Sequence, residues 1–292
     1  MEEALLICRF LHFSAAMALL GTTAFVATMM PAPLRCDLER PLRLMTIVLL
    51  AIAGLTTISW FGIEAATLGD GWSDAVNPDN LVAVITGTGF GAVWCWHAAI
   101  MALLIIAYFF AGPRRWPVLM LLSTLFLGSL GFIGHAAMLE GAIGWLQRLT
   151  QALHVISSGL WVGVLLPLAI CLTRLRQPAL RADVSIALHR FSGIGHFAVA
   201  LVILTGVVNT FLIVGGLPIN LSSRYQLLLD IKIALVLVMA LIAVVNRYVF
   251  VPAMTTRADY GLRNLVGGTV AEIVLSAGVI ALVSAFATYD PK

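Results

Sequence analysis

The chain has 292 residues, of which 61% are hydrophobic and only 11% are charged. A soluble domain carries about a quarter charged residues, so this composition excludes an ordinary soluble protein. The net charge of +3 says little by itself, because in a membrane protein the placement of charges matters more than their sum, and we expect no nucleic-acid partner.

Long apolar runs recur along the whole sequence. Each is long enough to cross a hydrocarbon core, which needs about 20 apolar residues of helix. In chain order we expect eight membrane-spanning helices, at about 4–30, 42–68, 91–110, 117–139, 147–172, 191–214, 226–250 and 266–288. The short alternating segments of a membrane β-barrel are absent from the sequence. The predicted fold class is all-α, a polytopic membrane helical bundle, with one integral-membrane domain over 1–292.

Basic residues gather in alternate connectors between these helices. The connectors after the first, third, fifth and seventh predicted helices hold most of the 17 Lys and Arg, whereas "GDGWSDAVNPDN" after the second holds none. The positive-inside rule places the basic connectors in the cytoplasm. Both termini are therefore expected on the periplasmic side.

Ligand-type side chains from five predicted helices fall at one depth. A rise of about 1.5 Å per residue puts His12, His135 and His154 in the outer leaflet, with Glu64 and His97 at a similar level. An ionisable side chain inside a bilayer usually faces the protein interior and has a partner. We therefore expect the imidazoles to converge just below the external surface.

Neighbouring residues indicate which histidines face the bundle. Small residues precede His135 along its predicted helix, which is typical of a closely packed face. His154 is followed by a polar stripe that predicts a pocket, made of Ser157, Ser158 and Trp161. His97 shares its face with side chains that lipid would accept, so it is a secondary candidate.

The donor set favours a soft or borderline metal ion. Imidazole combined with sulfur suits copper, and to a lesser degree zinc, nickel or haem iron. Cys8 lies one turn from His12, and Met138 lies one turn from His135, so each pair could present two donors. We predict metal ligation by His12, His135, His154, Cys8 and Met138, with secondary or transit positions at His196, His97 and Glu64.

A structural alternative stays open for each residue in this set. A single membrane histidine is more often a hydrogen-bonded structural residue than a ligand. Cys8 and Met138 taken singly are better explained by packing, and Glu64 by a position at the wet interface. In the inner half, Glu272 needs a cation, and Arg190 or Arg247 is the expected partner.

Seven stretches resemble a known family in their order along the chain. They are "CRFLHF", "GFGAVWCW", "GHAAMLEG", "ALHVISSGLWVGVLLP", "HRFSGIGHFAV", "NRYVFVP" and "SAFATYDP", and together they resemble the copper resistance protein D family. The resemblance implies an eight-helix protein of copper homeostasis in the bacterial inner membrane. It also implies movement of copper from periplasm to cytoplasm, with a periplasmic copper-binding partner of the CopC type.

Carried onto this sequence, the resemblance matches His12, His135, His154 and His196. It does not include His97. After Trp161 the family usually has two glycines, whereas here Val162 precedes Gly163, which makes close packing at this point less certain.

Two functions of different classes follow. The leading hypothesis is a copper permease rather than an enzyme; no ATP-binding loop or phosphorylated-aspartate motif is visible, so transport would depend on a gradient or a partner. The alternative is a haem b membrane protein that reduces cupric ions and uses the same histidines as axial ligands. The sequence leaves the copper oxidation state, the energy source and the oligomeric state open.

Overall fold

The structure, a computed structural model, describes residues 1–134, 138–218, 220, 223–286 and 289. Helices make up nearly all of this part of the chain, and no β-strand occurs in it. The α-helices are α1 (Glu2–Ala24), α2 (Ala32–Leu68), α3 (Pro78–Gly87), α4 (Gly89–Phe110), α5 (Arg115–Ser129), α6 (Gly141–Val162), α7 (Leu165–Leu172), α8 (Arg181–Val214), α9 (Arg224–Val245), α10 (Val251–Thr256) and α11 (Ala258–Phe286).

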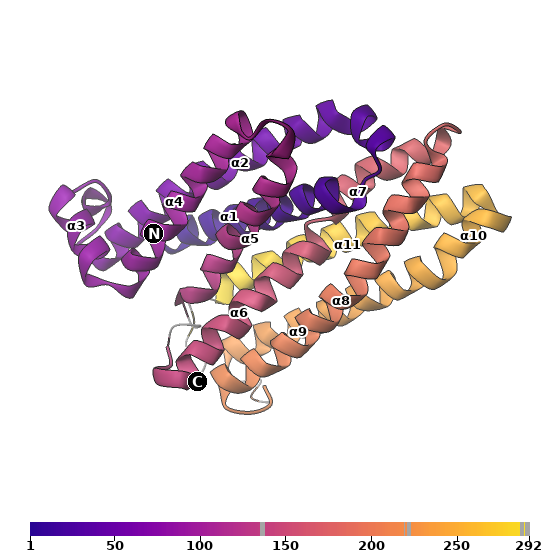
Figure 1. The fold of residues 1–292 in the computed structure, drawn as a ribbon. Helices are drawn as coiled ribbons and strands as arrows, with labels where there is room; N and C mark the ends of the chain where they lie inside the picture. Colours follow the sequence, from indigo (N-terminus) through magenta and orange to yellow (C-terminus); the bar gives the residue numbers. More distant parts are fainter. Residues whose placement is uncertain (135–137, 219, 221–222, 287–288, 290–292) are drawn as a thin grey trace.

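Eight helical segments in the described ranges are long and apolar enough to cross a membrane. They cover 2–29, 32–68, 89–110, 112–132, 141–176, 181–214, 224–256 and 258–285. The prediction of an all-α bundle with eight spans is confirmed. α1 begins and α11 ends at the same end of the bundle (Figure 1), as an even number of spans requires. The side of the membrane on which this end lies stays a prediction, as does the single domain over 1–292.

The fourth span ends earlier than the sequence predicted. The expected helix over 117–139 is α5, which passes into a single 3₁₀ turn, Leu130–Phe132. Gly134 then has a φ of +66°, a left-handed conformation that a continuing helix cannot contain. The predicted continuation of this helix is therefore wrong at residues 133 and 134. His135 itself lies outside the described residues, with Ala136 and Ala137.

α1 is the centre of the bundle. It packs against α2, α5, α6 and α11, and in Figure 1 it lies among them. Where α1 crosses the junction of α6 and α7, a Cβ on Gly21 would collide with the backbone of Gly163, and one on Gly163 would collide with the backbone of Met17. Close packing after Trp161 is thus present with a single glycine, Gly163. The backbones of α1 and of the α6–α7 junction approach each other where Gly21 and Gly163 have no side chains.

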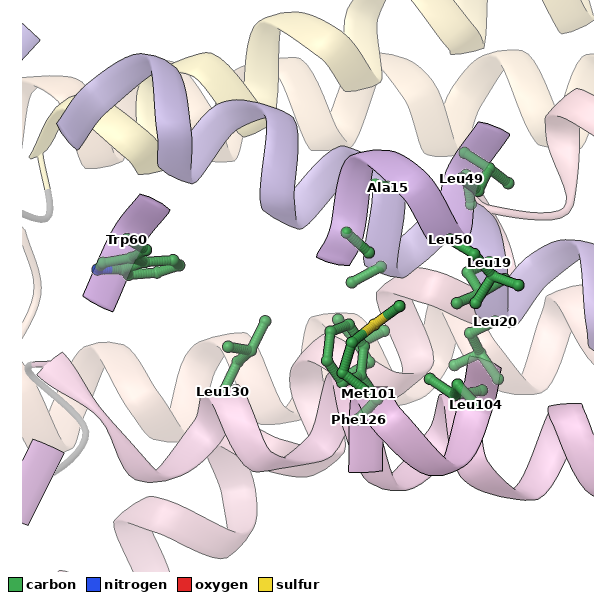
Figure 2. Close-up of a cluster of buried hydrophobic side chains, with 14 of the residues drawn as sticks. Ala15, Leu19, Leu20, Leu49, Leu50, Trp60, Met101, Leu104, Phe126 and Leu130 are labelled. Carbon is green, nitrogen blue, oxygen red and sulfur yellow. The ribbon is translucent and has the colours of Figure 1, made fainter. Parts of the chain in front are cut away.

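A large apolar cluster fills the space between α1, α2, α4 and α5 (Figure 2). Trp60 lies at one end of this cluster in the view, and Leu49 and Leu50 lie at the other. Phe126 is fully buried within it. Lipid tails offer no less apolar an environment than such a cluster, so its contribution comes from close van der Waals packing.

Candidate metal centre

Two histidines from different helices meet inside the apolar cluster. His12 on α1 and His97 on α4 are both fully buried, and their Nε2 atoms lie 3.1 Å apart. The structure thus brings a primary candidate together with a secondary one. The expectation that lipid would accept the face of His97 is wrong, because α4 turns that face toward α1.

A hydroxyl group fixes the far side of each ring. His12 Nδ1 lies 2.8 Å from Thr56 Oγ1 on α2, and His97 Nδ1 lies 2.7 Å from Ser129 Oγ at the end of α5. Each hydroxyl also donates to a backbone carbonyl one turn earlier in its own helix, at 2.7 Å in both cases. Four helices therefore set the orientation of two imidazoles.

Aromatic side chains enclose the pair. The ring of His97 is stacked between Trp94, with centroids 4.7 Å apart, and Phe126, with centroids 4.0 Å apart. Trp60 meets His12 edge-on at 5.4 Å. The indole of Trp94 is itself fixed, because its Nε1 donates to Thr57 O at 3.0 Å. Enclosed by these aromatic rings, the two Nε2 atoms face each other.

The two predicted sulfur ligands, Cys8 and Met138, have other surroundings than the histidine pair. Cys8, one turn before His12, donates from Sγ to Thr56 O at 3.5 Å. Met138 is 55% exposed. Within the described ranges, no group of three or more His, Cys, Asp or Glu side chains is close enough to share one metal ion. Ligation by Cys8 and Met138 stays a prediction.

His154 and Glu64 face a cavity rather than the pair. Both line a space of about 220 Å³, together with Arg9 and Lys232. The Nδ1 of His154 lies 3.0 Å from Thr205 Oγ1, so the ring is oriented from α8. Trp60 borders the same cavity and also touches His12. The structure thus joins His12 to His97 and places His154 at a cavity. The predicted convergence of both with His135 lies outside the described residues.

Two of the three predicted pocket residues after His154 do line a cavity. Ser158 and Trp161 line a second cavity of about 290 Å³, which His154 and Lys232 also border. Ser158 donates to His154 O at 2.8 Å. Ser157 is buried, donates to Leu153 O at 2.7 Å and does not line this cavity.

Glu272 is held by neutral donors, and the expected ion pair is wrong. Asn246 Nδ2 donates to one carboxylate oxygen at 2.9 Å, and Trp161 Nε1 donates to the other at 3.4 Å. Arg190 instead donates to a backbone carbonyl, Met29 O, at 3.4 Å. Arg247 shares a cavity with Glu272 without forming an ion pair with it in the described part of the chain. A π-helical turn that starts at Asn246 brings the amide, not the guanidinium, to the carboxylate.

His196 lines neither of the two cavities that His154 borders. Its Nδ1 is 2.5 Å from Ser192 O and its Nε2 is 3.1 Å from Tyr248 Oη. It borders the cavity of about 300 Å³ that also contains Glu272. The transit role predicted for it stays a prediction.

Sequence reasoning missed the groups that orient the pair. Thr56 and Ser129 carry no metal-binding signal of their own, and helix interiors commonly contain such hydroxyls bonded to the preceding turn. A usable signal was the gathering of Trp60, Trp94 and Phe126 at one level of separate helices, as a wall around a polar centre.

Comparison with known proteins gives consistent matches along the chain. Residues 1–145 match a family model described as copper resistance protein D-like, N-terminal domain, and residues 185–286 match one described as copper resistance protein D. The chain is 34% identical to the inner membrane protein YebZ of Escherichia coli K12, over 97% of each protein.

Two further relatives are more distant. The chain is 31% identical to copper resistance protein D of Pseudomonas syringae pv. tomato, over 76% of this chain and 74% of that one. It is 26% identical to the copper transport protein CutJ of Bacillus subtilis 168, over 68% of this chain and 38% of that one. No solved structure matches the chain significantly.

Proposed function

Because the chain belongs to the copper resistance protein D family, we propose that it binds copper ions at its buried histidine pair and passes them across the membrane. Family membership and the eight apolar helices make it a multi-pass protein of the bacterial inner membrane. The observation that supports the finer proposal is the 3.1 Å approach of the Nε2 atoms of His12 and His97. Imidazole nitrogen is a good ligand for copper.

In this proposal the copper ion is cargo and enters from the periplasmic face. The cavity lined by Glu64 and His154 is the entrance, since it borders Trp60, which contacts His12. His135, Cys8 and Met138 are proposed to assist capture on the way in, and a periplasmic copper carrier of the CopC type is proposed to deliver the ion. The cavity beside His196 is the exit on the inner side.

The haem alternative finds no support in the arrangement of the described histidines. A macrocycle held between His12 and His97 would have to displace the aromatic rings that enclose both imidazoles. Stacked rings already occupy both faces of His97. An absorbance spectrum of the purified protein tests this point directly, because a Soret band that shifts on reduction would favour haem.

The transport proposal is tested by copper accumulation in cells that depend on this protein. His12→Ala and His97→Ala are each expected to abolish protein-dependent accumulation, while His189→Ala, which removes an exposed imidazole on α8, is the matched control. Membrane abundance and melting temperature are measured for every variant. Unchanged accumulation in His12→Ala, at equal abundance, would contradict the proposal.

A further inference from the structure

We propose that the pair holds copper as Cu(I), bound by two ligands alone, His12 Nε2 and His97 Nε2. The inference rests on the proposed function, because it assumes that the cargo is copper, and it adds the oxidation state and the coordination number. It rests on the approach of two imidazole nitrogens inside an apolar cluster and on the proton positions that we assign to the four groups around them.

We use the hydroxyl contacts to assign the nitrogen of each ring that carries its proton. Thr56 donates its only hydroxyl proton to a carbonyl of its own helix, and Ser129 does the same. Toward the imidazoles each hydroxyl therefore presents a lone pair, and it accepts the hydrogen bond from His12 Nδ1–H or His97 Nδ1–H. A neutral imidazole has one proton, so in this assignment Nδ1 holds it and Nε2 is bare on both rings, which is the tautomer that a metal ion between the rings requires.

Two bare nitrogens then face each other at 3.1 Å. This arrangement is unfavourable in an apolar, water-excluding site, where unpaired polar atoms are costly. In the metal-free protein one ring can remove the conflict by carrying its proton on Nε2 and donating it to the other ring, while a metal ion between the nitrogens removes it with both hydroxyl contacts unchanged. The same second-layer hydrogen bonds that fix the tautomer of metal-bound histidines in other proteins are thus already formed here.

The number of donors selects among metal ions. Cu(II) prefers a tetragonal set of ligands and Zn²⁺ a tetrahedral one, whereas Cu(I), with a filled d shell, accepts two ligands in a line. In the described part of the chain no third His, Cys, Asp or Glu joins the pair. Trp94, Phe126 and Trp60 occupy the surrounding positions.

Charge favours the same ion. The pair supplies two neutral ligands and no carboxylate, so a bound ion keeps its full charge within the apolar cluster. The desolvation penalty rises steeply with ionic charge, which favours a monovalent ion over a divalent one. With metal–nitrogen bonds of about 2 Å, a linear site needs about 4 Å between the nitrogens, so we expect the rings to separate by roughly 1 Å on binding.

The experiment uses the full chain, purified in detergent and titrated without oxygen against a chromogenic Cu(I) chelator. We expect one Cu(I) per chain and an X-ray absorption spectrum of two-coordinate copper with two nitrogen neighbours. Cu(II) and Zn²⁺ at equal concentration should not displace it. His12→Ala and His97→Ala should each lose the site, and His189→Ala should retain it.

A subtler pair of variants keeps both imidazoles. Ser129→Ala and Thr56→Val remove the acceptors that hold the Nδ1 protons, and we expect Cu(I) affinity to fall about 10–100-fold. The melting temperature should fall only moderately, because each variant leaves one buried N–H without its acceptor. Wild-type affinity in both variants would overturn the tautomer argument. They also keep the test decisive if an alanine variant at His12 fails to fold.

The outcomes separate this inference from the proposed function. Preferential binding of Cu(II) or Zn²⁺, or copper with three or more ligands, would overturn the Cu(I) proposal while leaving transport intact. A pair that shares a proton and binds no metal would overturn both. Two-coordinate Cu(I) in a protein whose histidine variants still accumulate copper would overturn transport alone.

Discussion

The packed region, formed by α1, α2, α4 and α5, and the cavity region, formed by α6, α8, α9 and α11, hold their histidines differently. In the packed region His12 and His97 are fully buried and touch aromatic rings. In the cavity region His154 and Lys232 border a space of about 290 Å³. They also border a space of about 220 Å³ that Trp60 and Glu64 of the packed region help to line. One region fixes the distance between donors, and the other leaves room around them.

The difference follows from how much of each helix is covered. The apolar windows of the four packed-region spans are 33–50% buried, whereas those of the α8, α9 and α11 spans are only 11–22% buried. α9 therefore has few neighbours to close the spaces along it. The α6 span, which contacts both α1 and α8, is 61% buried. A rigid donor pair needs packing on every side, and an entrance or exit needs the opposite. In the proposed function, the packed region binds the ion, and the cavities provide its entrance and exit.

The largest effect is expected where the two regions meet. Gly163→Leu would push a side chain into the backbone of α1 at Met17, and backbone atoms cannot move aside as a side chain can. We expect a loss of more than about 4 kcal/mol of folding free energy, at the extreme end for a point mutation. Denaturant unfolding in detergent and size-exclusion profiles measure it.

Gly193→Leu is the matched control for this substitution. Gly193 is exposed on α8, and a Cβ there meets no atom within 4 Å. We expect this variant to retain wild-type stability within about 0.5 kcal/mol. Similar losses at both glycines would mean that the contact between α1 and the α6–α7 junction does not hold the regions together.

The next effect isolates the packed region. Phe126→Ala removes a fully buried ring that stacks on His97 and leaves a cavity that neighbours fill only partly. We expect a loss of about 3–5 kcal/mol and a weaker hold on the His97 ring. Phe110→Ala, at a position that is 81% exposed, should change the unfolding free energy by less than about 0.5 kcal/mol. Equal effects would contradict the distinction between the packed region and its surface.

Most of the fold was predictable from the sequence because lipid imposes a simple rule. Each apolar run of sufficient length becomes a helix, since backbone groups in a bilayer must bond within their own segment, and all eight expected spans are present. The end of α5 was not predictable. A glycine is tolerated within a membrane helix as well as at its end, so only the observed φ of Gly134 distinguishes the two.

The shared level of His12 and His97 was predictable, but the direction in which each side chain points was not. Counting residues along a helix gives depth, and His12 and His97 do meet. Which face of α4 turns inward depends on its rotation against α1, and Trp94 and Met101 beside His97 suit lipid and core equally. For Glu272, charge alone suggested an arginine, whereas the local π turn supplies Asn246 instead. Such contacts depend on a few degrees of helix rotation that no residue pattern encodes.

A third prediction concerns the cavity region and asks what Glu272 needs. Glu272→Leu leaves the N–H groups of Asn246 and Trp161 without an acceptor in an apolar interior. We expect a loss of about 2–3 kcal/mol, less than two full bonds because the Trp161 contact is long. Glu272→Gln keeps an acceptor and should lose less than about 1 kcal/mol. Melting temperatures compare the two, and equal losses would show that the negative charge, rather than the acceptor, stabilises this region.

The smallest effect is expected at the aqueous boundary. Arg174, in the turn after α7, places Nε 2.7 Å from Asp37 Oδ2 on α2, and both side chains are partly exposed. An exposed ion pair contributes less than about 1 kcal/mol, so Arg174→Ala and Asp37→Asn should each lower stability by a few tenths of a kcal/mol. The loss should be smaller in high salt, because screening already weakens this ion pair in the wild-type protein. A larger, salt-independent loss would mean that this contact, and not the backbone approach at Gly163, joins α2 of the packed region to the rest of the bundle.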